Sequence, residues 1–209
     1  MDRAGSQGRR QIEQRPPVAL EKLKSHLGEF FAAARAEHDA QRSLPSVALV
    51  YTVIDILGSL ERAEGEGTRK SFVRWVDSYL LPNAGLPCNA LDLYAARCGI
   101  LHALTPEADL VKKGEARRLA YAWGTGSAED LREIGKRLER SDVVAIHVGD
   151  LISGVHEALD RYLSAVSSDA KRLAEIDSRS SQWFAMLPLE IAAQYLARTG
   201  GRTRGILGA

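Results

Sequence analysis

Two side chains that could act together on a phosphate group lie five positions apart near the middle of the chain. Arg97 and His102 belong to the stretch Asn89–His102, in which most other residues are apolar. A histidine side chain can move a proton near neutral pH. A planar guanidinium can hold a phosphate through paired hydrogen bonds. The two residue types therefore suit proton transfer beside a phosphate, provided that the fold brings them to one place.

The stretch that carries this pair is predicted to be a buried helix. Asn89 is a suitable N-cap, and Asp92 lies in the first turn, where a carboxylate meets the positive end of the helix dipole. Apolar residues recur at helical spacing, namely Leu91, Tyr94, Cys98 and Leu101. In an α-helix five residues advance by about 500°, so Arg97 and His102 would point about 140° apart. Either the backbone bends at Gly99 or at the helix end, or a second copy of the chain supplies the complement.

Asp55 is an isolated carboxylate in the apolar helix expected over residues 47–60. A buried charge of this kind needs a partner, because leaving it unpaired costs several kcal/mol. One interpretation is a pair or hydrogen bond that only fixes helix packing. The other makes Asp55 an orienting group for Arg97 or His102. In the purely structural case Arg97 pairs with Asp55 or Asp92, and His102 caps the C-terminus of its helix.

A basic group, Arg69, Lys70 and Arg74, lies on the outer face of a third helix predicted over residues 69–81. It has two interpretations, a patch that contacts phosphates or a solvated helix face. The Pro-, Asn- and Gly-rich segment 82–87 that follows is expected to form a loop leading to Asn89.

Composition narrows the class of protein. The hydrophobic content of 45% in 209 residues is enough for a buried core, and we expect one domain. The net charge of +1 gives no support for broad electrostatic binding to duplex nucleic acid. Cys88 and Cys98 are ten positions apart, about 15 Å along a helix, so we expect reduced thiols and a cytoplasmic protein. Without a secretory signal or a run near the ~20 apolar residues of a membrane span, no membrane association is expected.

Several chemistries have no motif in the sequence. We find no phosphate-binding Gly-rich loop followed by Lys and Ser or Thr, no Cys-x-x-Cys, no His-Glu-x-x-His and no Gly-x-Ser-x-Gly. His26, His38, His147 and His156 are too scattered to form a ligand cluster. We therefore expect neither a metal site nor a cofactor.

The motif and its setting resemble HEPN domains, which are helical nucleotide-binding and RNA-cleaving modules. The six residues Arg97-Cys-Gly-Ile-Leu-His102 match the Arg-x4-6-His motif of that family. Supporting runs occur in order over residues 53–58, 67–73 and 93–102, and the resemblance covers about residues 43 to 166. Cys98 departs from the family pattern, since active members commonly carry a polar residue directly after the motif arginine.

The resemblance implies a function and a mechanism. Active members cleave RNA without a metal, at a cleft that two copies of the motif form in a homodimer. On that basis we expect an endoribonuclease for single-stranded RNA, with His102 as the proton-transfer residue and Arg97 as the phosphate binder. The alternative is a non-catalytic dimer that binds RNA, a nucleotide or a partner protein through the same surface.

The expected fold is mainly α, an antiparallel helical bundle like that of HEPN domains with a small two-stranded β element. We expect a disordered arm over residues 1–17, one helical domain over 18–198 and a flexible basic tail over 199–209. Beyond the helices already given, helical patterns cover residues 20–40, 127–138, 149–166, 167–176 and 189–196. The two strand-like runs, 118–123 and 143–148, are expected to pair antiparallel. An apolar segment, 183–188, is expected to clamp onto the core or a partner chain.

Overall fold

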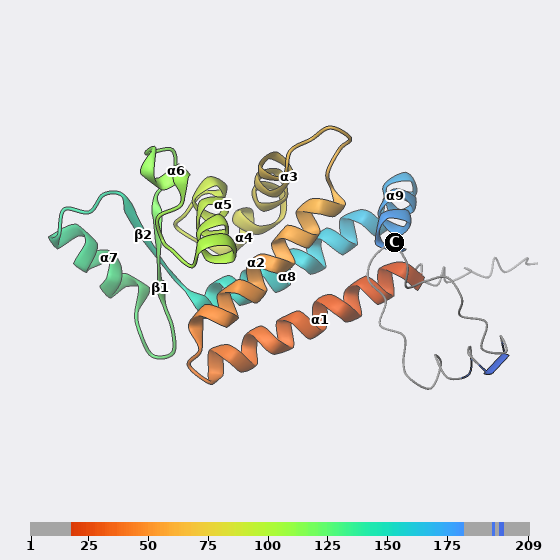
Figure 1. Ribbon diagram of the computed structural model, residues 1–209, viewed down its shortest axis with the longest axis horizontal. Coiled ribbons are helices and arrows are strands. Elements are labelled where there is room, and N and C mark those ends of the chain that lie inside the picture. Colours follow the sequence, from red (N-terminus) through yellow and green to blue (C-terminus); the bar gives the residue numbers. More distant parts are fainter. Residues whose placement is uncertain (1–17, 182–193, 195–196, 199–209) are drawn as a thin grey trace, which may run out of the picture.

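Three long helices lie side by side and form the body of the protein (Figure 1). They are α1 (Val18–Asp39), α2 (Ser43–Leu60) and α8 (Val148–Ser167), and α9 (Ala170–Ser181) packs across their far end. The computed structural model describes residues 18–181, 194 and 197–198. A short turn through Gln41 joins α1 to α2, so these two helices run antiparallel.

Helix α2 is the central element of the bundle. Its sequence is apolar around most of its circumference, and side chains such as Tyr51, Val53 and Ile54 are completely buried. By length and composition it is the one helix, within the described part of the chain, that could also cross a membrane. Its contacts with α1, α3 and α8 place it in the protein core instead, where an all-round apolar helix is expected.

A second group of shorter helices covers one side of the bundle (Figure 1). The third predicted helix is present as α3 (Thr68–Trp75), a π-helical turn η1 (Val76–Leu80) and α4 (Leu81–Ala84). Gly58 of α2 lets α3 approach closely, because a Cβ there would lie 3.1 Å from the Cα of Phe72. After the loop come α5 (Ala90–Cys98), a second π-helical turn η2 (Gly99–Ala103) and α6 (Asp109–Lys112).

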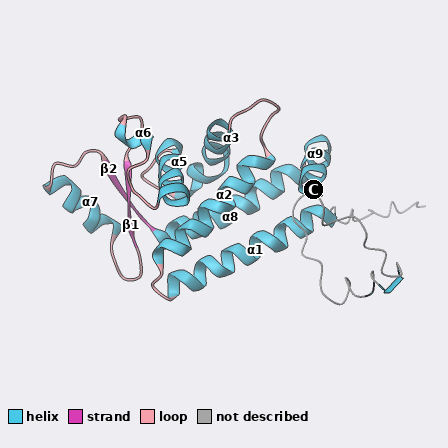
Figure 2. Cartoon of the chain, in the orientation of Figure 1, coloured by secondary structure: helices cyan, strands magenta, loops and turns pink. Residues whose placement is uncertain are grey.

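The two strands pair parallel, so the antiparallel pairing expected from the sequence is wrong. Strand β1 (Arg118–Ala122) and strand β2 (Val143–His147) are joined by α7 (Ala128–Arg137), as Figure 2 shows. A helix between two strands carries the chain back to the end where the first strand began, which makes the strands parallel. In the register Leu119↔Val144 and Tyr121↔Ile146, these four side chains join the main core, and α7 packs on the sheet.

The predicted fold class is confirmed at the level of a mainly helical protein with a small two-stranded element. Segments 1–17, 183–188 and 199–209 lie outside the described residues, as does the helix expected over 189–196 apart from Gln194. The limits of a single domain over 18–198 stay a prediction.

Candidate functional site

Helix α5 begins with a capping box that also ties it to the sheet. The side chain of Asn89 accepts a hydrogen bond from the backbone N–H of Asp92, at 2.8 Å, and the Asp92 carboxylate accepts one from the N–H of Asn89, at 3.0 Å. The same buried carboxylate accepts hydrogen bonds from the backbone N–H of Arg117 (2.7 Å) and from its Nε (3.1 Å) and Nη2 (2.7 Å). Asp92 therefore serves the cap and Arg117, and it is not the partner of Arg97.

The backbone changes from α-helix to π-helix directly after Cys98. In the turn η2 the N–H of Leu104 bonds to the carbonyl of Gly99, five residues earlier, and Leu104 ends the turn with a left-handed φ of 49°. Gly99 is required at this place, because a Cβ would overlap the carbonyl oxygen of Thr105. The N–H of Thr105 in turn donates to the carbonyl of Gly99, at 3.1 Å. The chain thus folds back tightly over Gly99.

This wider turn brings Arg97 and His102 together within one chain. The Nη1 of Arg97 lies 2.7 Å from the Nε2 of His102. A separation of about 140° applies to a regular α-helix, whereas the i→i+5 hydrogen bond of a π-turn widens the turn and brings positions i and i+5 closer together around the axis. The sequence allows two ways to bring the side chains together, a change of the backbone at Gly99 or the helix end, or a second copy of the chain. The structure shows the first of these, at Gly99. A second copy is not needed to pair the two side chains.

Asp55 of α2 holds the other side of the Arg97 guanidinium. Its Oδ2 accepts hydrogen bonds from Nε, at 2.7 Å, and from Nη2 of Arg97. Burial by itself would lower the pKa of Arg97, but the hydrogen bond and the charge of Asp55 outweigh it and raise the pKa. The Arg97 side chain is 13% exposed and that of Asp55 19%. The ion pair sets the direction in which Arg97 points.

The hydrogen bond from Arg97 also determines which ring nitrogen of His102 carries the proton. Since a guanidinium in a protein stays protonated and can only donate, the Nε2 of His102 must accept and Nδ1 must carry the ring proton. The second N–H of Nη1 points to the Sγ of Cys98, at 3.8 Å. Four of the five N–H groups of Arg97 are therefore engaged.

His102 is exposed and lines a groove of about 490 Å³. Its other walls come from α3, α5 and α6. The groove-lining residues with polar or reactive side chains include Arg69, Tyr94, Cys98, Glu107, Asp109 and Lys112. The cations Arg69 and Lys112 thus line the same groove as the imidazole, together with two carboxylates. Lys112, at the end of α6, is not predictable as a site residue, because Lys112-Lys-Gly in the sequence indicates only the end of an element.

The predicted basic group is only partly available. Arg69 lines both the His102 groove and a shallower hollow of about 710 Å³, which Lys70 and Arg74 also line. Arg74 is held by an ion pair with Glu66 and donates to the carbonyl of Glu61, at 2.6 Å. Arg69 donates to one carboxylate, Glu115, at 3.1 Å. A role of these cations in phosphate binding stays a prediction.

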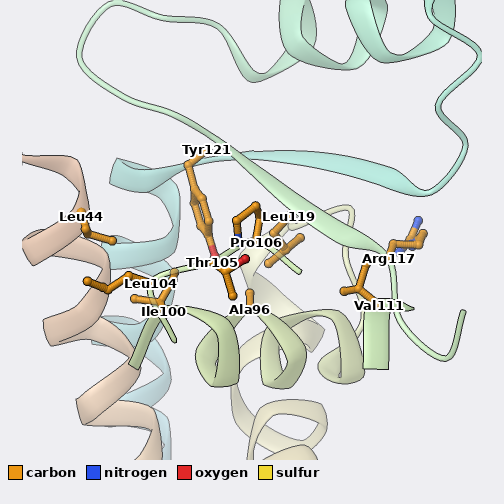
Figure 3. Close-up of a pocket in the computed structure, with 10 residues that line it drawn as sticks. All are labelled: Leu44, Ala96, Ile100, Leu104, Thr105, Pro106, Val111, Arg117, Leu119 and Tyr121. Atoms are coloured by element: carbon orange, nitrogen blue, oxygen red, sulfur yellow. The ribbon is translucent and has the colours of Figure 1, made fainter. Parts of the chain in front are cut away.

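An apolar cleft of about 180 Å³ also borders the helix that carries the site (Figure 3). It lies between β1 and the helix, and its lining includes Ala96, Ile100, Leu104, Leu119 and Tyr121, with Leu44 of α2 at one end. Sequence patterns do not predict this cleft, because it forms only once the strand lies beside the helix. The helix that carries the Arg97–His102 pair therefore borders both a groove with polar side chains and an apolar cleft.

The two cysteines should react with alkylating agents at very different rates. Both are free thiols. Cys88 is 7% exposed, and burial together with the nearby charge of Asp92 raises the pKa of its thiol to about 12. Because the thiolate is the reactive form, we expect iodoacetamide at about pH 8 to modify Cys98 at least tenfold faster than Cys88. Peptide mass spectrometry of a time course measures both rates, and equal rates in the folded protein would contradict the burial of Cys88.

Comparisons with known proteins leave the family open. A scan against protein-family models, a search of curated proteins and a search of solved structures each returned no match. The resemblance to HEPN domains therefore rests on the residues alone. Within the described ranges no group of three or more His, Cys, Asp or Glu side chains is arranged to hold a metal ion.

Proposed function

We propose that this protein is a metal-independent endoribonuclease that acts on single-stranded RNA at the groove containing His102. The observation that carries the proposal is the 2.7 Å contact between Arg97 Nη1 and His102 Nε2 at the wall of an open groove. A proton acceptor and a phosphate-binding cation are the two groups that cleavage through a ribose 2′-OH requires. The resemblance to HEPN domains supports the same chemistry.

In the proposed reaction a phosphate of the RNA replaces His102 as the acceptor of the Arg97 Nη1 hydrogen bond. This exchange frees the Nε2 lone pair of His102, which takes the proton of the adjacent 2′-OH. The bond from O2′ to phosphorus forms as the bond to O5′ breaks. O5′ takes a proton from water, and the hydroxide left behind takes the proton from His102. The products carry a 2′,3′-cyclic phosphate and a 5′-hydroxyl. Arg97 stabilises the extra charge on phosphorus, and Asp55 keeps the guanidinium in place.

The groove fits an unpaired strand better than a duplex. Tyr94 is an aromatic lining residue on which a base could stack, and Arg69 and Lys112 offer exposed cations for flanking phosphates. Stacking on aromatic side chains and backbone contacts with cations are how proteins commonly bind single strands. A homodimer stays part of the proposal, with the second copy contributing a second Arg97–His102 pair.

Cleavage of RNA in the presence of EDTA tests this function. We expect the wild-type protein to cut a single-stranded RNA and His102→Ala to be at least ~100-fold slower, because one positioned general base contributes on the order of 10²–10⁴ in rate. His26→Ala, which removes an exposed histidine of α1, is the matched control and should cut at the wild-type rate. A 2′-deoxy substitution at the cut site should block the reaction. Equal cleavage by wild type and His102→Ala would sink the proposal.

A second candidate function is non-catalytic binding of RNA or a nucleotide in the same groove. It is favoured by the engagement of Arg97, whose Nε and Nη2 are already bound to Asp55. In that case Arg69 and Lys112 provide the phosphate contacts, and fluorescence anisotropy should show salt-dependent RNA binding without cleavage. The double variant Arg69→Ala/Lys112→Ala should then bind RNA more weakly, whereas His102→Ala should leave the affinity almost unchanged.

A further inference from the structure

Helix α7 carries apolar side chains that the rest of the described chain leaves uncovered. Leu131, Ile134 and Leu138 follow one another at helical spacing, the last of them at the C-cap. Ile134 is 51% exposed and Leu138 66%, and no residue of α7 is buried. Figure 1 shows α7 at one end of the molecule, away from the three-helix body. Two large aliphatic side chains one turn apart on a protruding helix are typical of a contact surface.

The charges on α7 indicate what covers these side chains. Its first half carries Glu129 and Asp130 beside Arg132, and its second half carries Lys136 and Arg137 beside Glu133, so each half has a small net charge, acidic in the first and basic in the second. When two copies of such a helix pack antiparallel, the acidic half of each faces the basic half of the other, and the helix dipoles also oppose. A twofold contact brings the same patch of both copies together, so a self-complementary surface is what it requires.

The ion pairs within α7 do not prevent its charged side chains from pairing with those of a second copy. Arg132 pairs with Glu129, and Lys136 and Arg137 both pair with Glu133, at spacings of three and four residues. These pairs are partly or largely exposed, and exposed pairs of this kind contribute little to stability. Their carboxylates and guanidinium groups can therefore pair across a contact at small cost.

We propose that α7 is the surface through which two copies of this chain associate, with Ile134 and Leu138 packing against their equivalents in an antiparallel pair. This inference names a contact surface for the homodimer that the proposed function includes, but it does not depend on catalysis, since the Arg97–His102 groove is built from other elements. One short helix buries a modest area, so the dissociation constant should lie in the range of about 1 µM to about 1 mM.

Sedimentation velocity over that concentration range tests the apolar part of the proposal. We expect Ile134→Ser/Leu138→Ser to weaken self-association at least ~10-fold, because the wild-type contact covers both side chains in both copies. Circular dichroism should show that this variant is folded, since neither side chain belongs to the core. Leu104→Ser, at a site that is 73% exposed but far from α7 in sequence, is the control and should associate like wild type. A wild-type protein that stays monomeric, or a double variant that associates equally well, overturns the proposal.

Charge reversal tests the antiparallel arrangement. Glu129→Lys/Glu133→Lys makes α7 mainly basic, and Lys136→Glu/Arg137→Glu makes it mainly acidic, so each variant alone should associate at least ~10-fold more weakly than wild type. An equimolar mixture of the two should form a mixed dimer, and raised salt should weaken it. A mixture that associates no better than its separate components overturns the proposed orientation and with it the α7 contact.

Discussion

Replacing Gly99 by alanine is expected to destroy the π-turn and separate Arg97 from His102. The added Cβ would overlap the carbonyl oxygen of Thr105, a backbone atom that cannot rotate away. Relieving the overlap requires residues 99–105 to shift, which should lower the free energy of unfolding by about 1–3 kcal/mol. If the proposed function holds, RNA cleavage should fall as far as it does in His102→Ala. Chemical denaturation and the cleavage assay measure the two effects.

Gly28→Ala is the matched control for this substitution. Gly28 lies in α1 with nothing within 4 Å of where its Cβ would be, so alanine should stabilise the helix by about 0.5–1 kcal/mol and leave cleavage unchanged. If Gly99→Ala is as stable as the wild type and retains full activity, the tight reversal over Gly99 is not a requirement of the site.

Replacing Asp92 by alanine is expected to cause the largest loss of stability. Its carboxylate is completely buried and accepts hydrogen bonds from Asn89 and from three N–H groups of Arg117. The Arg117 side chain is 41% exposed, so water can solvate its charge when Asp92 is removed. The loss comes instead from the capping box and from the backbone N–H groups of Asn89 and Arg117, which lose their acceptor. We expect a cost of about 2–4 kcal/mol, a large part of the ~5–15 kcal/mol that keeps a typical protein folded. Because these bonds also join α5 to β1, both the His102 groove and the apolar cleft should be disturbed. Urea denaturation measures the loss.

Asp39→Ala provides the comparison. The side chain of Asp39 is 80% exposed at the end of α1, and removing it should change the free energy of unfolding by less than about 0.5 kcal/mol. Equal unfolding midpoints for the Asp92 and Asp39 variants would mean that the buried network does not support α5.

The helical part of the fold could be predicted because its signals are local. Apolar spacing and capping residues such as Asn89 and Ser127 mark helices within a few residues, and the structure has helices at those places. Whether the two strands pair parallel or antiparallel depends instead on the connection between them. The helix at residues 128–137 was visible in the sequence, and its length already favoured a crossover and a parallel pair. The pattern of each strand alone carries no information on the direction of pairing.

The candidate site was predictable in its residue types but not in its geometry. Arg97, His102 and the need of Asp55 for a partner follow from chemistry and burial. The choice of Asp55 over Asp92 as the partner of Arg97 depends on Arg117, which lies 25 residues beyond Asp92 and reaches it only in the folded chain. The π-turn depends on a single contact between Gly99 and the backbone that follows, and helical periodicity does not report such a contact.

The protonation pattern of the His102 ring tests most directly whether the turn pairs the two motif side chains. Long-range ¹H–¹⁵N correlation spectra at about pH 8, where an ordinary histidine is neutral, distinguish the two ring nitrogens. His102→Gln identifies the signals. We expect an unprotonated Nε2 that accepts from Arg97 and a proton on Nδ1, and we expect Arg97→Ala to remove this preference. A proton on Nε2 in the wild-type protein would contradict the pairing of Arg97 with His102.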